Sequence, residues 1–303
     1  MRNSFIKTLT DIAKQDPRVV LLTGDLGFSV LEEFQELYPT RFYNCGVSEQ
    51  NMVGLATGLA EAGYFPFVYS IATFSVLRPF EFIRNGPVLH RLPVRIVGVG
   101  AGYEYGDLGT THHLIEDIAL MRSQIGLTTY IPFDPSQAQN ILLKTYSQSG
   151  PIYYRLGKDE KRIVPELKGD YNPNSFQTVG KGKDLCLVTT GSVTRSMLDI
   201  VPEFEKENIK ITVLIVDSID HNVHHKLLPT ITLFDKVISV EDHVISGGIG
   251  SVVAETIAEK GLSIKLRRLG CHDKEDGIFG CREFLYKKHG MNFSAIKTVY
   301  GEM

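Results

Sequence analysis

The sequence is poor in several features that would each point to a particular class of protein. Its 303 residues include no tryptophan and four cysteines, and Cys45, Cys186, Cys271 and Cys281 form no CxxC pair. This usage excludes a disulfide-rich scaffold and a cysteine-based zinc site, and it fits a reducing compartment. No apolar signal segment follows Met1, and no apolar run reaches the roughly 18 residues of a membrane span, so we expect a cytoplasmic protein.

The sequence also lacks an excess of positive charge. Thirty-two Lys and Arg residues stand against 35 Asp and Glu residues, which gives a net charge of -3, and there is no basic block. Nucleic acid and membranes are therefore not expected as partners, whereas small molecules and other protein chains are. The apolar fraction of 43% and the charged fraction of 22% are those of an ordinary folded protein, and the length suggests two domains.

Alternating helical and extended patterns fill the first half of the chain. Apolar residues between Phe5 and Ala13 recur on one helical face, and Val19–Leu22 then has the pattern of a short buried strand. The alternation continues with helices expected at 48–62, 79–90, 115–122 and 136–146, and strands at 66–70, 94–99, 128–131 and 152–155. Short apolar strands separated by helices predict a parallel α/β sheet.

The periodicity lapses between Lys158 and Lys183, where charged, proline, asparagine and glycine residues are typical of a linker. A second alternation follows, with strands expected at 185–189, 211–216, 236–240 and 264–269, helices at 193–207 and 249–260, and terminal helices from Gly280. We therefore predict two consecutive parallel-sheet α/β domains, at residues 1–160 and 184–303, joined by a linker at 161–183.

A glycine-punctuated loop at residues 44–48 leads into a helix of small residues. Glu49 lies in the first turn of this helix, where a carboxylate can simply stabilise the positive end of the helix dipole. The glycines and alanines between residues 54 and 60 let another backbone approach the helix closely, which places Glu49 near a packed interface. A carboxylate in such a place can hold a proton.

Further motifs follow along the chain, and each also has an ordinary structural interpretation. Residues 73–80 (TFSVLRPF) could be core, and the adjacent histidines within 106–119 (GDLGTTHH, then EDIA) are more often solvated than metal-bound. Arg155 lies at the carboxyl end of a strand and could form a plain ion pair. Residues 240–251 (VEDH, then GGIGS) allow tight strand-to-helix packing or subunit contact. Residues 221–225 (HNVHH) have one nearby carboxylate and are expected to be a surface loop.

Together these segments resemble the thiamine diphosphate enzymes of the transketolase family, in the family's order and over nearly the whole chain. The loop before Glu49 resembles the Gly-[Ile/Val]-x-Glu turn of the family's pyrimidine-binding domain. Residues 106–113 resemble its Gly-x-Thr-His loop, residues 153–157 its arginine-bearing last strand, and residues 240–251 its C-terminal domain. The resemblance implies a pyrimidine-binding domain followed by a transketolase C-terminal domain.

The resemblance also implies which residues would bind the cofactor. Glu49 would hydrogen-bond N1′ of the pyrimidine, because thiamine becomes a nucleophile only when its 4′-amino group takes the imino form. Phe74 would stack on the pyrimidine face. Leu77 and Phe80 would close this pocket, and Leu26 would lie next to the thiazolium ring.

On the substrate side, the resemblance assigns catalysis to His112, which would handle protons on substrate hydroxyls. Four further residues would bind the substrate, and among them Arg155 would be a fixed fork for a phosphate. Arg78 resembles an arginine of the related deoxyxylulose-phosphate synthases. The other two are His113 and Asp107. No residue of this chain is expected to bind a metal.

The chain lacks the Gly-Asp-Gly…Asn motif through which the family holds Mg²⁺ and the cofactor's diphosphate. The nearest string, Gly24-Asp25-Leu26-Gly27, ends the first strand of the pyrimidine-type domain. We therefore interpret the chain as the C-terminal subunit of a split enzyme in which a separate N-terminal subunit holds Mg²⁺. Two active sites between the two kinds of subunit imply an α2β2 assembly.

The expected reaction is the transfer of a two-carbon ketol unit between sugars or sugar phosphates. Two alternatives stay open: decarboxylation of a 2-oxo acid, as in deoxyxylulose-phosphate synthases or the β subunits of 2-oxo acid dehydrogenases, and a non-catalytic interaction subunit. Leu108 stands where transketolases have an aspartate for a sugar hydroxyl, and Gly100 where they have a histidine for the substrate phosphate. These departures predict a substrate other than the standard pentose phosphates, such as a modified or nucleotide-linked sugar.

Overall fold

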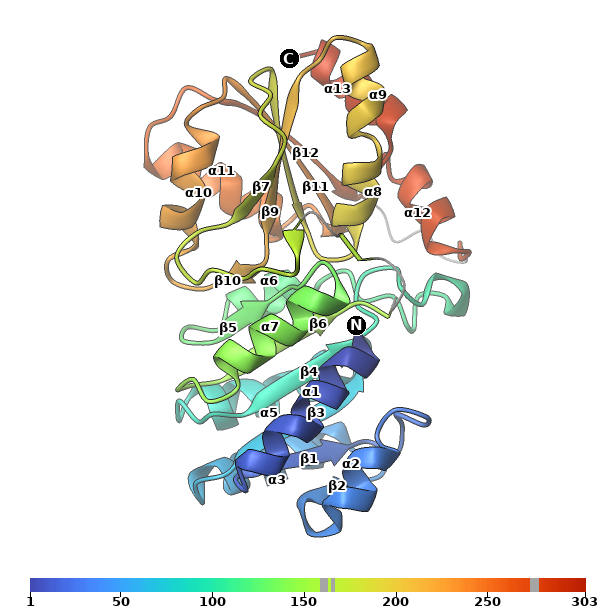
Figure 1. The fold of residues 1–303 in the computed structure, drawn as a ribbon, viewed down its shortest axis with the longest axis vertical. Coiled ribbons are helices and arrows are strands. Elements are labelled where there is room, and N and C mark those ends of the chain that lie inside the picture. The colour runs from blue at the N-terminus through green and yellow to red at the C-terminus, as the bar shows by residue number, and fades with distance from the viewer. Residues whose placement is uncertain (159–162, 165–166, 273–277) are drawn as a thin grey trace. The chain divides into compact units, whose positions relative to one another are not determined.

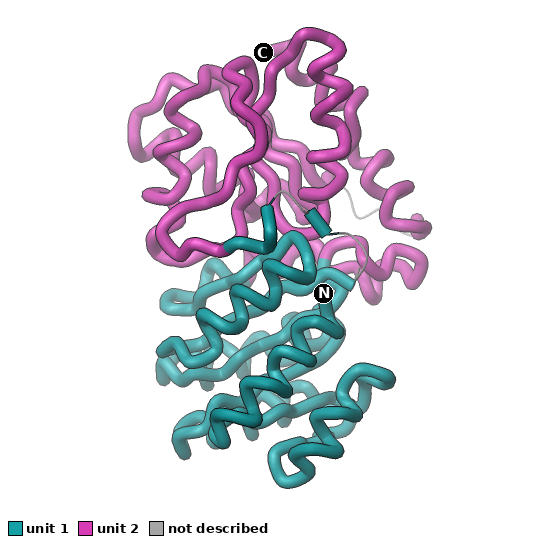
Figure 2. The backbone as a smooth tube through the Cα atoms, in the orientation of Figure 1, with its two compact units in different colours: residues 1–101, 121–170 teal, residues 102–120, 171–303 magenta. Residues whose placement is uncertain are grey.

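The computed structural model describes residues 1–158, 163–164, 167–272 and 278–303, and the chain forms two compact units. Unit 1 comprises Met1–Ala101 and Met121–Asp170, and unit 2 comprises Gly102–Leu120 and Tyr171–Met303 (Figure 2). Residues 102–120 therefore pack with unit 2 although they lie within the first half of the sequence. No helix in the described part of the chain is both long and apolar enough to cross a membrane.

Unit 1 is built on a parallel sheet with the strand order β5-β6-β4-β3-β1-β2 (Figure 1). Its strands are β1 (Val19–Thr23), β2 (Phe42–Asn44), β3 (Phe65–Ile71), β4 (Arg95–Val99), β5 (Thr128–Tyr130) and β6 (Ile152–Leu156). Strands β1, β4 and β6 are buried along their whole length, as expected when helices cover both faces of a parallel sheet.

The helices of unit 1 alternate with its strands. They are α1 (Arg2–Gln15), α2 (Glu32–Leu37), the short 3-10 helix η1 (Pro39–Arg41), α3 (Glu49–Glu61), α4 (Ala72–Val76), α5 (Phe80–Ile83), the π-helical turn η2 (Arg84–Val88) and α7 (Pro135–Thr145). Helices α1 and α7 lie side by side (Figure 1). Phe5 of α1 reaches the core, where its ring packs edge-on against Phe67 and Tyr154.

Strand β1 is the point at which the sheet order reverses. After β1 the chain forms β2 on one side and then crosses to β3 on the other, so β1 pairs with both. In open parallel sheets, ligands bind beyond the carboxyl ends of the strands at such a reversal. A ligand site is therefore expected in the segments that follow β1, β2 and β3.

Unit 2 contains a sheet with the order β12-β11-β8-β9-β7, in which only β7 is antiparallel to its neighbour. The strands are β7 (Gln177–Val179), β8 (Leu185–Thr190), β9 (Ile211–Val216), β11 (Lys236–Val244) and β12 (Lys265–Cys271). The short strand β10 (Ser218–Ile219) is not part of this sheet. Helices α10 (Val223–Ile231) and α11 (Ile249–Glu259) cover one face of the sheet (Figure 1). The other face is covered by α8 (Val193–Asp199), α9 (Val201–Lys206) and α13 (Phe293–Gly301).

Three elements complete the fold: η3 (Gly106–Leu108), α6 (Asp117–Arg122) and α12 (Arg282–Lys288). The predicted fold class of two consecutive parallel-sheet α/β domains is confirmed by the two sheets with alternating helices. The domain limits at 160 and 184 stay a prediction. Residues 159–162 and 165–166, where the first domain was expected to end and the linker to begin, lie outside the described residues.

Two local predictions were wrong, and the predicted linker, whose limits stay a prediction, contains a strand. Residues 193–207 form two helices rather than one, because Pro202 lies in the first turn of α9 and cannot continue a helix from α8. The predicted linker contains β7, whose backbone pairs with β9. The histidine segment 221–225 is not a surface loop throughout: α10 begins at Val223, and His224 Nδ1 hydrogen-bonds Thr256 Oγ1 on α11 at 2.8 Å.

Candidate active site

The carboxyl ends of β1, β2 and β3 bring together the segments that carry the predicted cofactor residues. Gly24 follows β1 directly, and the backbone there approaches the side chain of Glu49 in the first turn of α3. A Cβ atom at Gly24 would lie 3.4 Å from Glu49 Oε1, an ordinary van der Waals distance, so Gly24 and the Glu49 carboxylate are direct neighbours.

The carboxylate of Glu49 is buried, with 1% of the residue exposed. Arg78 Nη1 donates to both Glu49 oxygens, Oε1 and Oε2, at 3.0 Å each. The Arg78 side chain is 41% exposed, so solvent reaches the pair from the arginine side only. A buried carboxylate is costly without such a partner, which explains why the two side chains meet.

Phe74 is carried by α4, the short helix that follows β3. Gly98 on β4 lets α4 lie close to the sheet, since a Cβ there would come within 3.2 Å of Ala72 Cα and 2.9 Å of the Tyr153 ring. The Phe74 ring is half-buried, and Arg78 Cζ lies 4.0 Å from its centroid, within the range of a cation–π contact. Arg78 therefore contacts both partners, and we call these three residues the Glu49–Arg78–Phe74 cluster.

The other predicted cofactor residues lie on segments adjoining this cluster. Leu77 is 40% exposed, and Phe80, which opens α5, is half-buried. Leu26 is half-buried in the loop after β1, where its carbonyl accepts a hydrogen bond from Thr23 Oγ1 at 2.9 Å. Partly exposed apolar side chains beside a polar cluster provide a surface that a flat organic ring could cover.

Arg155 is placed differently from the other predicted residues of unit 1. It lies in β6 directly opposite Gly98 of β4 and is only 3% exposed. Arg155 and the Glu49–Arg78–Phe74 cluster both lie toward the carboxyl ends of the parallel strands. They are separated sideways, because β4 lies between β6 and β3. Its predicted contact with a substrate phosphate stays a prediction.

His112, His113 and Asp107 lie in the segment that belongs to unit 2. His112 is half-buried, and its Nδ1 hydrogen-bonds Thr111 Oγ1 at 2.9 Å. His113 is 8% exposed, and its Nε2 donates to the Gly106 carbonyl at 2.9 Å, so its ring braces the loop from inside. Asp107 is exposed, as is Leu108, which is 56% exposed.

At the glycine-rich turn after β11, the carboxylate of Glu241 lies at the N-terminal end of α11. Glu241 accepts hydrogen bonds from the backbone N–H groups of Ile249 at 2.6 Å and Gly250 at 2.9 Å, at the start of α11. Any side chain at Gly248 would collide with this carboxylate. Of the two predicted roles for this turn, the contacts in unit 2 therefore bear out tight strand-to-helix packing.

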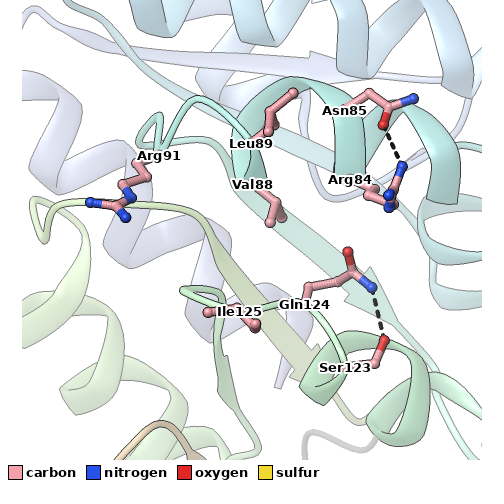
Figure 3. A pocket seen from close by; sticks show the side chains of 8 residues that line it. All are labelled: Arg84, Asn85, Val88, Leu89, Arg91, Ser123, Gln124 and Ile125. Atoms are coloured by element: carbon pink, nitrogen blue, oxygen red, sulfur yellow. Dashed lines mark hydrogen bonds between the residues drawn. The ribbon is translucent and has the colours of Figure 1, made fainter.

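Two hollows on unit 1 are lined by none of the predicted site residues. The larger has a volume of about 430 Å³ and is lined by Arg84, Asn85, Val88, Leu89, Arg91, Ser123, Gln124 and Ile125 (Figure 3). The smaller, about 290 Å³, is lined by Gly54, Thr57, Glu81, Phe82, Asn85 and Gly86. Neither hollow contains a member of the Glu49–Arg78–Phe74 cluster. Within the described ranges, no group of three or more His, Cys, Asp or Glu side chains could hold a metal ion.

Reasoning from the sequence missed the pairing of Glu49 with Arg78 and the contacts that hold residues 102–116. The contacts of residues 102–116 pair Tyr103 with His289 and Glu104 with Arg282, residues that lie far apart in the sequence. The charges of Glu104 and Arg282 were visible, but no local spacing linked them.

Comparison with known proteins places both halves of the chain. Residues 1–162 match the transketolase pyrimidine-binding domain, and residues 175–296 match the transketolase C-terminal domain. A protein of Methanocaldococcus jannaschii named as a transketolase C-terminal section is 33% identical over 314 residues, covering 100% of this chain and 96% of the relative. An apulose-4-phosphate transketolase subunit of Actinobacillus succinogenes is 34% identical over 300 residues, covering 98% of this chain and 96% of the relative.

A solved structure and a second group of relatives extend the comparison. The structure described as "Split gene transketolase, inactive beta4 tetramer" superimposes with a TM-score of 0.86 at 30% identity, covering 99% of this chain and 97% of the other. The 1-deoxy-D-xylulose-5-phosphate synthase of Syntrophotalea carbinolica is 29% identical over 297 residues, which are 96% of this chain but 46% of the synthase.

Proposed function

Because the chain belongs to the transketolase family, with the family's pyrimidine-binding domain followed by its C-terminal domain, we propose that it is the C-terminal subunit of a split, thiamine diphosphate-dependent transketolase. The enzyme would transfer a two-carbon ketol unit between sugars or sugar phosphates. It would act only with an N-terminal subunit that carries Mg²⁺ and the diphosphate site. The observation that carries this proposal is the Glu49–Arg78–Phe74 cluster at the reversal point of the sheet.

The cluster fits the pyrimidine half of the cofactor. An aminopyrimidine needs a carboxylate for N1′ and an aromatic face for its ring. The guanidinium of Arg78 is itself a planar group with N–H donors, and it lies within 3.0 Å of both Glu49 oxygens and 4.0 Å from the centre of the Phe74 ring. The contacts of this planar group support the idea that a second planar group can use the same two surfaces once it displaces Arg78 from them.

Each predicted cofactor residue of unit 1 would then have a specific role. Glu49 would share the proton at N1′, Phe74 would orient the ring, and Leu26, Leu77 and Phe80 would exclude water around it. Thiamine diphosphate would supply a nucleophilic thiazolium carbon, which no protein side chain provides.

The roles proposed for the substrate-binding residues are less specific than those for the cofactor residues. His112 would exchange protons with substrate hydroxyls, and His113, Asp107, Arg78 and Arg155 would bind the sugar. The substrate named for the Actinobacillus succinogenes relative, apulose 4-phosphate, supports the prediction of a sugar other than the standard pentose phosphates. The exposed side chain of Leu108, where the family has an aspartate, supports it further.

The partner is inferred from what this chain would need. A diphosphate requires a bivalent cation held by oxygen ligands. Among the described residues, no group of three or more His, Cys, Asp or Glu side chains could hold such a cation. Relatives named as a transketolase C-terminal section and as one subunit of an apulose-4-phosphate transketolase support a separate N-terminal chain, and we propose two copies of each in an α2β2 assembly. We also propose a cytoplasmic location.

A second reaction keeps the same cofactor. The synthase relatives and the presence of Arg78 favour decarboxylation of a 2-oxo acid as the alternative. Reconstituting the chain with its N-terminal subunit and offering either a ketose phosphate or pyruvate with an aldose phosphate would separate the two reactions, because only the second releases CO₂. Loss of either activity in Glu49→Gln would support the shared cofactor role. Glu61→Gln on the same helix is the control and should keep wild-type activity. If Glu49→Gln also keeps it, the non-catalytic interaction subunit becomes the favoured alternative.

A further inference from the structure

The loop that carries His112 is fastened to the C-terminal part of the chain by its own side chains. We call residues 102–116 the histidine loop; all of them belong to unit 2. The ends of the loop are tied together by hydrogen bonds from Gly102 N to Leu114 O at 2.6 Å and from Leu114 N to Gly102 O at 3.2 Å. Val244 at the end of β11 donates to Ile115 O at 2.8 Å, so the base of the loop is joined to the central sheet of unit 2.

A buried ion pair is the first side-chain anchor. Glu104 Oε1 lies 2.8 Å from Arg282 Nη1, and the two side chains are 4% and 11% exposed. Breaking a buried pair by removing one partner is strongly destabilising because the other charge is left unpaired. The N-terminal end of α12 and the first part of the histidine loop are therefore held together.

A ring contact is the second anchor. Tyr103 OH forms a hydrogen bond of 2.9 Å with His289 Nε2, and the two rings stack with centroids 5.5 Å apart. Tyr103 also packs edge-on against His113 at 5.1 Å. A row of three rings thus runs from the C-terminal helices to the residue beside His112.

The Gly106 carbonyl joins the two sides of the loop. It accepts from His113 Nε2 at 2.9 Å and from the backbone N–H of Gly280 at 3.2 Å. A Cβ at Gly106 would come within 2.3 Å of the Gly280 carbonyl oxygen, so only glycine allows this approach. The position of the His112–His113 pair therefore depends on residues that precede α12.

Building on the proposed function of His112, we propose that Arg282 and His289 are positioning residues for catalysis: through Glu104 and Tyr103 they hold the histidine loop in the conformation that presents His112 to the substrate. Gly102 and Gly109 have φ values of +66° and +77°, which gives the loop backbone freedom that the anchors remove. Misplacement of a reacting group by about 1 Å can cost roughly 100-fold in rate. The C-terminal domain would then be part of the catalytic apparatus.

Two variants test the anchors separately. Arg282→Gln removes the charge that pairs with Glu104, and Tyr103→Phe removes the hydroxyl that bonds His289 and also contacts Cys271. Arg195→Gln is the control, because it breaks a more exposed ion pair with Asp199, also in unit 2. Hydrogen–deuterium exchange of residues 103–113, measured on the chain alone, reports the loop without any reaction. We expect faster exchange in the two test variants and no change in the control.

Kinetics of the reconstituted enzyme complete the test. We expect kcat to fall by roughly 10- to 100-fold in Arg282→Gln, with the Kd for thiamine diphosphate within about twofold of wild type and partial rescue by Arg282→Lys. Unchanged loop exchange, or faster exchange with wild-type kcat, would overturn the proposal. If Arg282→Gln does not fold, Tyr103→Phe decides by the same two readouts. Wild-type activity of Glu49→Gln would instead refute the proposed function and leave the exchange result standing.

Discussion

The ion pair inside the proposed pyrimidine site yields a prediction that does not require the partner subunit. Replacing Arg78 with methionine removes the donor to both oxygens of a carboxylate whose side chain is 2% exposed. A hydrogen bond to a charged group contributes roughly 1.5–3 kcal/mol, and because the Arg78 side chain is 41% exposed we expect the lower end, about 1.5 kcal/mol. At about 2–4 °C per kcal/mol for units of this size, the melting temperature should fall by about 3–6 °C.

Thermal unfolding of the isolated chain, followed by circular dichroism, measures this effect. Arg195→Met is the matched control, and its more exposed pair with Asp199 at 3.0 Å predicts a change within about 0.5 kcal/mol. In a double-mutant cycle with Glu49→Gln, the second substitution should cost less than it does alone, because the two side chains share one interaction. Equal melting temperatures for Arg78→Met and Arg195→Met, or a fully additive cycle, would refute the pairing on which the cluster rests.

Three other predictions concern single side chains. Glu49→Gln in the reconstituted enzyme should lower the rate by roughly 10²- to 10⁴-fold while Glu61→Gln stays near wild type, and a mutant within threefold of wild type would remove Glu49 from the mechanism. Leu108→Asp should shift preference toward ordinary pentose phosphates in a competition assay; no shift, with efficient use of xylulose 5-phosphate by the wild type, would mean that Asp107 already makes the hydroxyl contact. Burial raises the pKa of Asp217 to about 7. The folded chain thus holds a proton on Asp217 that the unfolded chain releases near pH 4. The contribution of Asp217 to stability is therefore present below pH 4 and is lost as the pH rises toward 7. Asp217→Asn should flatten the plot of unfolding free energy against pH over this range.

Much of the fold could be predicted because most strands of the two sheets are short apolar runs separated by amphipathic segments. The strands expected at 19–22 and 94–99, for example, are observed at Val19–Thr23 and Arg95–Val99. The errors arose where a local pattern competes with a longer-range one. Pro202 interrupts an otherwise continuous helical periodicity, and β7 is a three-residue strand recruited by its pairing with β9 from a polar segment.

The candidate site was predictable only in part, for a related reason. The roles proposed for Glu49 and Phe74 rest on motifs that each occupy one stretch of sequence. The pairing of Glu49 with Arg78 joins residues 29 positions apart, and the pairing of Glu104 with Arg282 joins residues 178 apart. No periodicity or spacing records such contacts, because they depend on how the chain returns to the same place.

We propose that this chain holds the pyrimidine half of the cofactor site and needs a partner for the diphosphate half. Titration calorimetry with thiamine diphosphate and Mg²⁺ tests it directly, first on the purified chain and then on the chain mixed with the N-terminal subunit. We predict no tight Mg²⁺-dependent binding by the chain alone and stoichiometric binding by the mixture, lost again on chelation of Mg²⁺. Stoichiometric, Mg²⁺-dependent tight binding by the isolated chain would contradict the account.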